Sequence, residues 1–401
     1  MTMDIKKYSA FLEHVASEID IPPSKYQDAV DRYQAVGRWL ECGEYPRCQG
    51  ELSICVQGSF RLGTVVRPVR DGIEACYDID LVCEIPLHKD QTTPQAVKSM
   101  VGDRLRDHGT YKKLLDSEGR RCWTLEYGEQ DGVGFHLDVL PAVPDPHGLL
   151  DTAIAITSKT YDSSYSWSSS NPRGYGIWFD AKNASAFARA AFEQKESIQR
   201  GASTIYASVD EVPDQLVRTP LQRSIQLMKR HRDLRFNHHE RINYAPISII
   251  ITTLAAHLYG NEGDVYSALS GIVSNLQAHA ALVEGKSIDR SLGARGLIQR
   301  KSDGTWYVGN PVNPAENLAD RWHEDNHARA RAFFAWVDAL QKDLINILDD
   351  MNPHVLKEHL SRVLGEAAVT KHLDNVVPRP SVVDGPPRIH ITAAPKPWKG
   401  E

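Results

Sequence analysis

Residues 57–80 read QGSFRLGTVVRPVRDGIEACYDID, and this stretch decides the fold. Residues 51–57 alternate as a strand and lead into a Gly-Ser turn, and residues 76–85 (CYDIDLVCEI) predict a second strand. Because successive side chains of a strand point to opposite faces, Asp78 and Asp80 share one face. Two carboxylates one strand step apart repel each other unless a cation lies between them. The stretch is therefore either a hairpin with a polar rim or a phosphate clamp beside a metal site.

A third acid, Asp138, lies in FHLDVLP, which we expect to be a strand that ends at Pro141. If this strand pairs with residues 76–85, the three carboxylates converge. Three acids and a triphosphate can hold two Mg²⁺ ions about 4 Å apart, and Mn²⁺ can substitute. The alternative is that all three are exposed acids on half-buried strands.

The turn at Gly58 and Ser59 predicts a phosphate site. Glycine lets backbone N–H groups approach a phosphate closely, and the serine hydroxyl adds a donor. Thr64 and Arg67 can line the same turn, and Gln57 directly precedes it. A plain Gly-Ser turn is the alternative, and the downstream acids favour the phosphate site.

The rest of the chain predicts a mixed α/β region followed by a helical one. A capping box at Ser24 indicates a long helix over 24–40, and residues 121–127 and 134–143 read as further strands. Residues 157–176, rich in Ser and Tyr, predict a long loop. Helical patterns then cover 180–200, 220–234, 245–260, 265–285 and 327–351, and the Pro-rich end over 382–401 reads as an extended tail.

The helical part supplies candidate positive charge. Lys229 lies at the edge of an apolar helix face, from which it can reach a cleft and meet a triphosphate. Pro246 suits the first position of the next helix, which would place Ser248 in the first turn as an anion site or a simple cap. His231, His238 and His239 have no cysteine near them in sequence, so we interpret them as part of an exposed basic loop rather than a zinc site.

Composition limits the class of protein. The chain has 401 residues and a formal net charge of −6, which argues against a protein that coats nucleic acid over a broad basic surface. No run of eighteen apolar residues occurs, and the first twenty residues carry acids, unlike a signal peptide. We expect a cytoplasmic protein whose six cysteines are reduced thiols.

Taken together, these motifs resemble the CD-NTase family, the bacterial relatives of cGAS that make cyclic oligonucleotide signals in CBASS antiphage defence. The resemblance covers about residues 24–350. It rests on QGSFRLGT, YDIDL and HLDVLP, and then on WSSSNPRGYGIWF, LQRSIQLMKRHRD, PISIIITTLAAHLY and NPVNPAENLADRW. The Gly-Ser and three-Asp pattern is shared by the wider polymerase-β-like superfamily, and the later motifs narrow it to this family.

The resemblance implies an α+β fold, with a polymerase-β-like nucleotidyltransferase palm packed against a helical lobe. The expected divisions are N-terminal helices over 1–44, the palm over 45–180, the helical domain over 181–375 and the tail over 376–401. Asp78, Asp80 and Asp138 are expected to be the catalytic metal ligands. The nucleotide-binding residues would be Gln57, Gly58, Ser59, Thr64, Lys229 and Ser248.

The implied activity is synthesis of a cyclic di- or trinucleotide from ATP and probably GTP, with release of pyrophosphate and dependence on Mg²⁺. The product would contain purines and could be a cyclic GMP-AMP isomer that activates a downstream effector. The tail could be bound by a regulator or conjugated by a ubiquitin-transfer-like enzyme. We expect no membrane contact and no activation by duplex DNA, because the chain lacks the Cys-rich insertion of the animal sensor.

Two other functions remain open at this point: a related transferase that makes linear oligoadenylate or tails RNA, and a nucleotide-binding protein with a decayed site. The base choice is not readable. Tyr161, Tyr165, Trp167 and Tyr175 could form a stacking platform or could pack the two lobes together.

Overall fold

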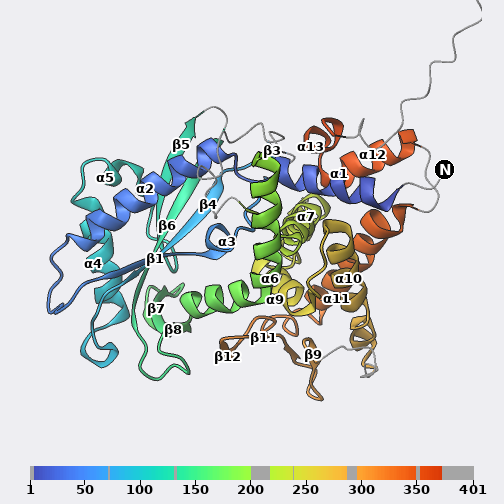
Figure 1. Ribbon diagram of the computed structural model, residues 1–401. Helices are drawn as coiled ribbons and strands as arrows, with labels where there is room; N and C mark the ends of the chain where they lie inside the picture. The colour runs from blue at the N-terminus through green and yellow to red at the C-terminus, as the bar shows by residue number, and fades with distance from the viewer. Residues whose placement is uncertain are drawn as a thin grey trace, which may run out of the picture.

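The computed structural model describes residues 4–70, 73–130, 133–199, 217–237, 239–286, 296–348 and 353–372. A mixed sheet occupies one side of the molecule and a group of helices the other, with helix α6 between them (Figure 1). This arrangement confirms the predicted α+β class. The predicted tail over 376–401 lies outside the described residues, and the divisions at 44, 180 and 375 remain predictions.

The main sheet has the order β1-β4-β6-β7-β8, with β5 also paired to β6. Its central pair, β4 and β6, is parallel, and its other pairs are antiparallel. The strands are β1 Ser53–Gln57, β4 Tyr77–Glu84, β5 Trp123–Gln130, β6 Val133–Pro144, β7 Ile154–Lys159 and β8 Tyr165–Ser170. The pairing of β4 with β6, on which convergence of the acids depended, is therefore present.

Pro141 does not end its strand, contrary to the prediction. It lies inside β6 opposite Cys83, and the strand continues to Pro144. A proline lacks only the N–H donor, so its carbonyl and its neighbours can still pair. β6 thereby gains the length to pair with β4 and β5 near its start and with β7 near its end.

The two faces of the sheet differ in character. One face carries Ile79, Leu81, Leu125 and Leu137, all fully buried under helices α2 Pro23–Glu41 and α4 Pro94–Arg106. The opposite face carries a smaller apolar cluster, with Val82 and Leu140, and the predicted acidic residues. Burial of the first face fixes the register, because a slip of one residue would turn the apolar set outward.

The predicted capping box at Ser24 is wrong. Helix α2 begins at Pro23, with Pro22 at the N-cap and no side-chain capping bond, so Ser24 lies inside the first turn. Pro23 accounts for the start, because its fixed φ suits the first helical position and it needs no hydrogen-bond partner there. The preceding helix, α1 Ile5–Glu18, packs on α7 and α10 of the helical lobe rather than on the sheet.

The predicted long loop at 157–176 is also wrong. This stretch forms the end of β7, strand β8 and the start of helix α6 Pro172–Gln199. The serines stand on an edge strand, where their low strand preference is compatible with pairing on one side. Helix α6 starts eight residues earlier than expected because Asn171 accepts a hydrogen bond from the N–H of Gly174 and Pro172 takes the first position.

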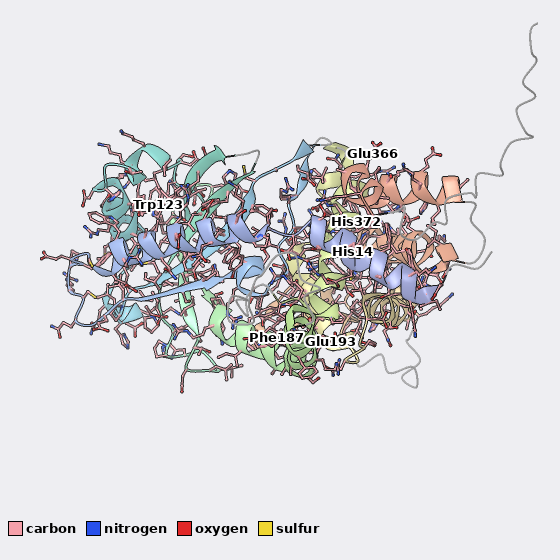
Figure 2. All side chains as sticks on the ribbon, turned by 45° about the horizontal axis from the view of Figure 1, so that its top comes forward. His14, Trp123, Phe187, Glu193, Glu366 and His372 are labelled. Carbon is pink, nitrogen blue, oxygen red and sulfur yellow. The ribbon has the colours of Figure 1, made fainter. Side chains whose placement is uncertain are left out.

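The helical lobe has one continuous apolar core that also includes Tyr8 and Phe11 of α1. Its remaining main helices are α7 Pro220–Arg235, α9 Ser248–Leu258, α10 Val265–Gln277, α11 Ala328–Leu340 and α12 Pro353–Leu364. Figure 2 shows His14 of α1 beside His372, and their rings stack with centroids 5.0 Å apart. The N-terminal helix is thereby joined to the far end of the described chain.

His231 does not belong to an exposed loop. It is 2% exposed inside α7, where its ring contacts Asp343 and accepts a hydrogen bond from Trp336. Burial lowers its pKa, with partial compensation from the Asp343 carboxylate. His239 begins the short helix α8 His239–Ile242, and His238 lies outside the described residues.

Candidate active site

Four polar residues form a row across the sheet. In the strand registers Gln57 lies opposite Asp80, Asp80 opposite Asp138, and Asp138 opposite Thr124. Residues opposite each other in neighbouring strands present side chains on the same face. The parallel pairing therefore brings together Asp80 and Asp138, which are 58 positions apart in the sequence.

Asp78 lies on the same face, one strand step away. Its register partner is His136, and the His136 Nδ1 and Asp78 Oδ1 atoms are 3.5 Å apart. Asp78 is exposed, whereas Asp80 and Asp138 are half-buried. Over the described ranges, no group of three or more His, Cys, Asp or Glu side chains is assembled as a metal site.

The electrostatics of Asp80 favour a cation. Burial raises the pKa of Asp80 to about 7, and the charges of Asp138 and Asp78 add to the rise, while Lys229 opposes it. A carboxyl group in this state is stabilised as an anion by a cation placed beside it. The donor set, carboxylate oxygens on one face of two adjoining strands, fits the oxygen ligands that Mg²⁺ prefers.

Gly58 lies directly against Asp80. Its φ is +66°, and a Cβ atom at this position would fall 2.1 Å from Asp80 Oδ2. Only glycine combines this left-handed backbone with so close an approach. The predicted phosphate turn and the predicted metal ligands thus adjoin, and Ser59 follows half-buried in the short helix α3 Gly58–Arg61.

Helix α7 holds the chain that follows this turn. Gln222 donates to the carbonyl of Leu62 at 2.9 Å, and Gln226 donates to that of Val65 at 2.9 Å. Lys229 Nζ donates to the carbonyl and hydroxyl oxygens of Thr64 at 2.9 and 3.1 Å. The three side chains follow at intervals of four and three residues, the spacing of one helix face. Sequence reasoning did not assign Gln226 a role, although that spacing was a usable signal.

Lys229 is buried, and its charge interacts with that of Asp80. Burial lowers its pKa to about 7, and the neighbouring Arg232 contributes, while Asp233 and Asp80 oppose the fall. Its Nζ contacts Thr64, which is itself fully buried. Lys229 thus connects the helical lobe to the Gly-Ser turn, and its predicted contact with a triphosphate remains a prediction.

Ser248 lies in the first turn of its helix, as expected, but Pro246 does not begin that helix. Helix α9 starts at Ser248, with Ile247 at the N-cap. The Arg232 guanidinium donates to the Pro246 carbonyl at 3.1 Å and to Ser248 Oγ at 2.9 Å. The bond to Pro246 lies just before the start of the helix. The bond to Ser248 places the half-buried Arg232 guanidinium beside the predicted anion-binding hydroxyl.

A cleft of about 240 Å³ opens beside Asp80, between the sheet and the helical lobe. Its walls come from Gln57, Gly58 and Asp80 on the palm side, from Asn171 and Tyr175 at the start of α6, and from Glu316 in strand β12 Asn313–Asn317. The predicted turn, Asp80 and the helical lobe therefore line a common space, and Asp78 and Asp138 are not among its lining residues. The lining residues come from five parts of the chain that are distant in sequence: 57–62, 80, 170–175, 249 and 310–316.

Tyr175 is the one candidate stacking residue that lines this cleft. Its hydroxyl bonds to Thr253 of α9 at 2.8 Å, so it also packs the two lobes together. Tyr161 is fully exposed in the turn between β7 and β8, and Tyr165 bonds to Glu118. Trp167 packs against the palm core. The structure therefore separates the four aromatic residues instead of assembling them into a platform.

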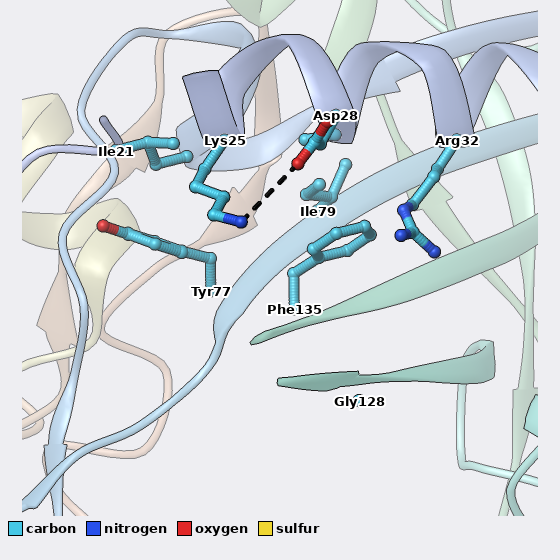
Figure 3. Close-up of a pocket in the computed structure, with 9 residues that line it drawn as sticks. Ile21, Lys25, Asp28, Arg32, Tyr77, Ile79, Gly128 and Phe135 are labelled. Carbon is cyan, nitrogen blue, oxygen red and sulfur yellow. Dashed lines mark ion pairs between the residues drawn. The ribbon is translucent and has the colours of Figure 1, made fainter. Parts of the chain in front are cut away.

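A second, much smaller hollow lies on the opposite face of the sheet, under helix α2 (Figure 3). Lys25 and Asp28 form an ion pair at its rim at 3.8 Å, and the Arg32 guanidinium lies 5.5 Å from the centre of the Phe135 ring. Tyr77 and Ile79 form its floor. We interpret it as part of the packing of α2 on the sheet.

The chain is similar to several known proteins. Residues 53–141, which contain the Gly-Ser turn and all three acids, match the model described as "Cyclic GMP-AMP synthase DncV-like, nucleotidyltransferase domain". A c-di-GMP synthase of Roseivirga ehrenbergii is 28% identical over 338 residues, which are 83% of this chain and 77% of that protein. The cyclic dinucleotide synthase CdnG of Bradyrhizobium diazoefficiens is 26% identical over 322 residues, 79% of this chain and 70% of the relative.

Solved structures show the same fold. The CdnG structure from Bradyrhizobium diazoefficiens, in complex with GTP, superposes with a TM-score of 0.66 at 22% identity, covering 92% of this chain and 98% of that one. The 3'-deoxy GTP bound form of Escherichia coli DncV gives a TM-score of 0.52 at 15% identity, covering 92% and 87%. The fold class expected from the sequence is thus confirmed, and residues 53–141 match a nucleotidyltransferase domain. The resemblance to the CD-NTase family is also confirmed.

Proposed function

We propose that this chain is a nucleotidyltransferase that joins NTPs into a cyclic di- or trinucleotide and releases pyrophosphate. The observation that carries the proposal is the parallel pairing that sets Asp80 opposite Asp138 directly beneath Gly58. The synthases to which the chain is similar make cyclic dinucleotides, and one is named for c-di-GMP. We therefore infer purine substrates, GTP and ATP, for this chain.

The chain's own residues would position the reactants. The backbone at Gly58 and the Ser59 hydroxyl would hold the donor triphosphate, with Gln57, Thr64, Lys229 and Ser248 around it. Asp78, Asp80 and Asp138 would hold two Mg²⁺ ions, which when bound stabilise the charges of the attacking and leaving oxygens. Mn²⁺ would substitute for Mg²⁺.

The reaction requires no covalent intermediate on the protein. A ribose hydroxyl oxygen bonds to the α-phosphorus, its proton passes to a carboxylate or water, and the bond to pyrophosphate breaks. A second such attack within the linear product closes the ring. Catalysis would then rest on positioning and charge neutralisation in the cleft between the lobes.

The test is a product assay on purified protein with Mg²⁺ and all four NTPs, one labelled with α-³²P at a time. After phosphatase treatment we expect a resistant product that is absent from the double variant Asp78→Ala, Asp80→Ala. A product that is fully degraded by phosphatase and 3'-exonuclease would instead indicate a linear oligonucleotide. Absence of pyrophosphate release with bound nucleotide would indicate a decayed site.

We further propose a place in CBASS antiphage defence in the cytoplasm, with an effector that responds to the product. Within the described residues, no helix has the length and apolar character needed to cross a bilayer. A regulator or conjugating enzyme acting on residues 376–401 would complete the system. Deleting residues 380–401 should then abolish phage protection while leaving the purified catalytic core active, and unchanged protection would contradict this role for the tail.

A further inference from the structure

Thr124 contacts one of the acids from the side opposite Asp80. It stands on β5, directly across from Asp138 on β6. Its hydroxyl donates to Asp138 Oδ1 at 2.5 Å. A hydroxyl bond this short to a carboxylate is typical of the stronger, charge-assisted kind.

The position of Thr124 in the sheet places this bond on the side of Asp138 that faces away from Asp80. Asp138 has Asp80 as its partner on one neighbouring strand and Thr124 on the other. The two carboxylates repel each other, and the bond from Thr124, with the nearby Cys122 thiol, opposes a rotation of Asp138 away from Asp80. Asp78 is exposed, and its register partner is His136, whose Nδ1 lies 3.5 Å from Asp78 Oδ1.

We propose that Thr124 is a positioning residue that holds the Asp138 carboxylate in the orientation needed to bind a divalent cation together with Asp80. This inference rests on the proposed function, because it assigns a task within the same site. Thr124 would act through Asp138 and would not itself contact the nucleotide. Hydrogen-bond donors to metal-binding carboxylates commonly change metal affinity or activity by about 10- to 100-fold when they are removed.

The alternative is that the bond only joins β5 to β6. The two strands are already paired at Trp123, Leu125 and Tyr127, so a purely structural hydroxyl would affect thermal stability and leave metal binding unchanged. Thr124→Val tests this directly, because valine keeps the shape and the branched Cβ and loses only the hydroxyl. Thr124→Ser keeps the hydroxyl and loses a methyl group.

Thr157 offers a matched control. It is a fully buried threonine on β7 of the same sheet, and its hydroxyl has no hydrogen-bond partner within the described part of the chain. Thr157→Val therefore removes a threonine hydroxyl from the sheet without removing a hydrogen bond to an acid. It should bind metal and turn over substrate as the wild type does.

The primary measurement is Mn²⁺ binding to the full chain without nucleotide, followed by the electron paramagnetic resonance signal of free Mn²⁺. We expect Thr124→Val to weaken Mn²⁺ binding about 10-fold or more and to lower kcat with little change in KM for NTP. Thr124→Ser should recover most of both losses. Equal Mn²⁺ affinity in Thr124→Val and the wild type would overturn the proposal, as would an equal loss in Thr124→Ser.

The same experiment separates this proposal from the proposed function. If wild-type protein binds Mn²⁺ but forms no cyclic product, the function is wrong, and the Thr124→Val comparison still decides whether the threonine supports cation binding. If the double variant Asp78→Ala, Asp80→Ala binds Mn²⁺ as tightly as the wild type, the acids are not the cation site. That result overturns both.

Discussion

At the scale of single residues, the contact between Gly58 and Asp80 connects the phosphate turn to the acids. A left-handed glycine packed against a carboxylate leaves no room for a side chain. Burial raises the pKa of the same Asp80 carboxyl, and the charges of Asp138 and Asp78 add to the rise. Two predictions follow from these contacts.

Gly58→Ala should reduce kcat at least about 100-fold, because the added Cβ would displace Asp80 and force a strained backbone. Turnover and the melting temperature are the measurements. Gly109→Ala is the control, because nothing lies within 4 Å of a Cβ there. An active Gly58→Ala variant would show that the turn need not touch Asp80.

Asp80→Asn should stabilise the metal-free protein at high pH. The pKa of Asp80 is near 7 in the folded state against 3.8 ordinarily, so the folded state binds more protons than the unfolded state between about pH 4 and 7. Wild-type stability therefore falls as pH rises through this window, and above pH 7 the variant should be more stable by about 2 kcal/mol.

Denaturant unfolding in EDTA at pH 4, 6 and 8 measures this difference. The gap between Asp80→Asn and wild type should be small at pH 4, full at pH 8, and reduced by added Mg²⁺ at pH 8. A gap that does not vary with pH would mean that neither burial nor the neighbouring carboxylates raise the pKa of Asp80.

At the scale of elements, side chains of helix α7 hold the backbone of residues 62–65 by hydrogen bonds. Three of its side chains, all buried, donate hydrogen bonds to the carbonyls of Leu62, Thr64 and Val65. The helical lobe thereby determines where the Gly-Ser turn lies above the sheet. This is a contact between lobes that no local pattern in the turn itself encodes.

Gln226→Met should destabilise the protein by about 1–3 kcal/mol, because the buried Val65 carbonyl would lose its donor. It should also raise KM for NTP, since the loop behind the turn would be less firmly held. Arg235→Met, an exposed change on the same helix, is the control. If the two variants unfolded at the same denaturant concentration, the bond from Gln226 to Val65 would not stabilise the protein.

At the scale of the whole molecule, Asp20 joins three parts of the chain. It lies between α1 and α2, its carboxylate accepts from Arg218 and Arg223 of the helical lobe, and its carbonyl accepts from Tyr77 of the palm. Asp20 is 7% exposed, so these contacts are shielded from solvent. The relative position of the two lobes therefore depends on this residue.

Asp20→Ala should cost about 3 kcal/mol or more, because it removes the buried carboxylate that Arg218 and Arg223 share and leaves Arg223 paired with the more exposed Glu13. We expect a lower melting temperature, and separate transitions for the two lobes in calorimetry. Asp28→Ala removes the partly exposed pair with Lys25 and should cost less than about 1 kcal/mol. Equal losses in the two variants would contradict a joining role for Asp20.

The sequence by itself determined the strands that carry the acids, the turn before them and most helices of the second half. These features depend on local alternation, helical spacing and the special geometry of glycine and proline, which short segments express without help from distant contacts. Local patterns failed at residues 157–176, where pairing with β7 makes a strand of a serine-rich segment.

Only the tertiary structure decided how the site is assembled. The pairing of Asp80 with Asp138, the bond from Thr124 and the hold of α7 on residues 62–65 all join residues far apart in the chain. The burial of His231 and the dispersal of the four aromatic residues were equally beyond local reasoning. The physical reason is that burial, and the pKa shifts it causes, are properties of packed neighbours and not of sequence spacing.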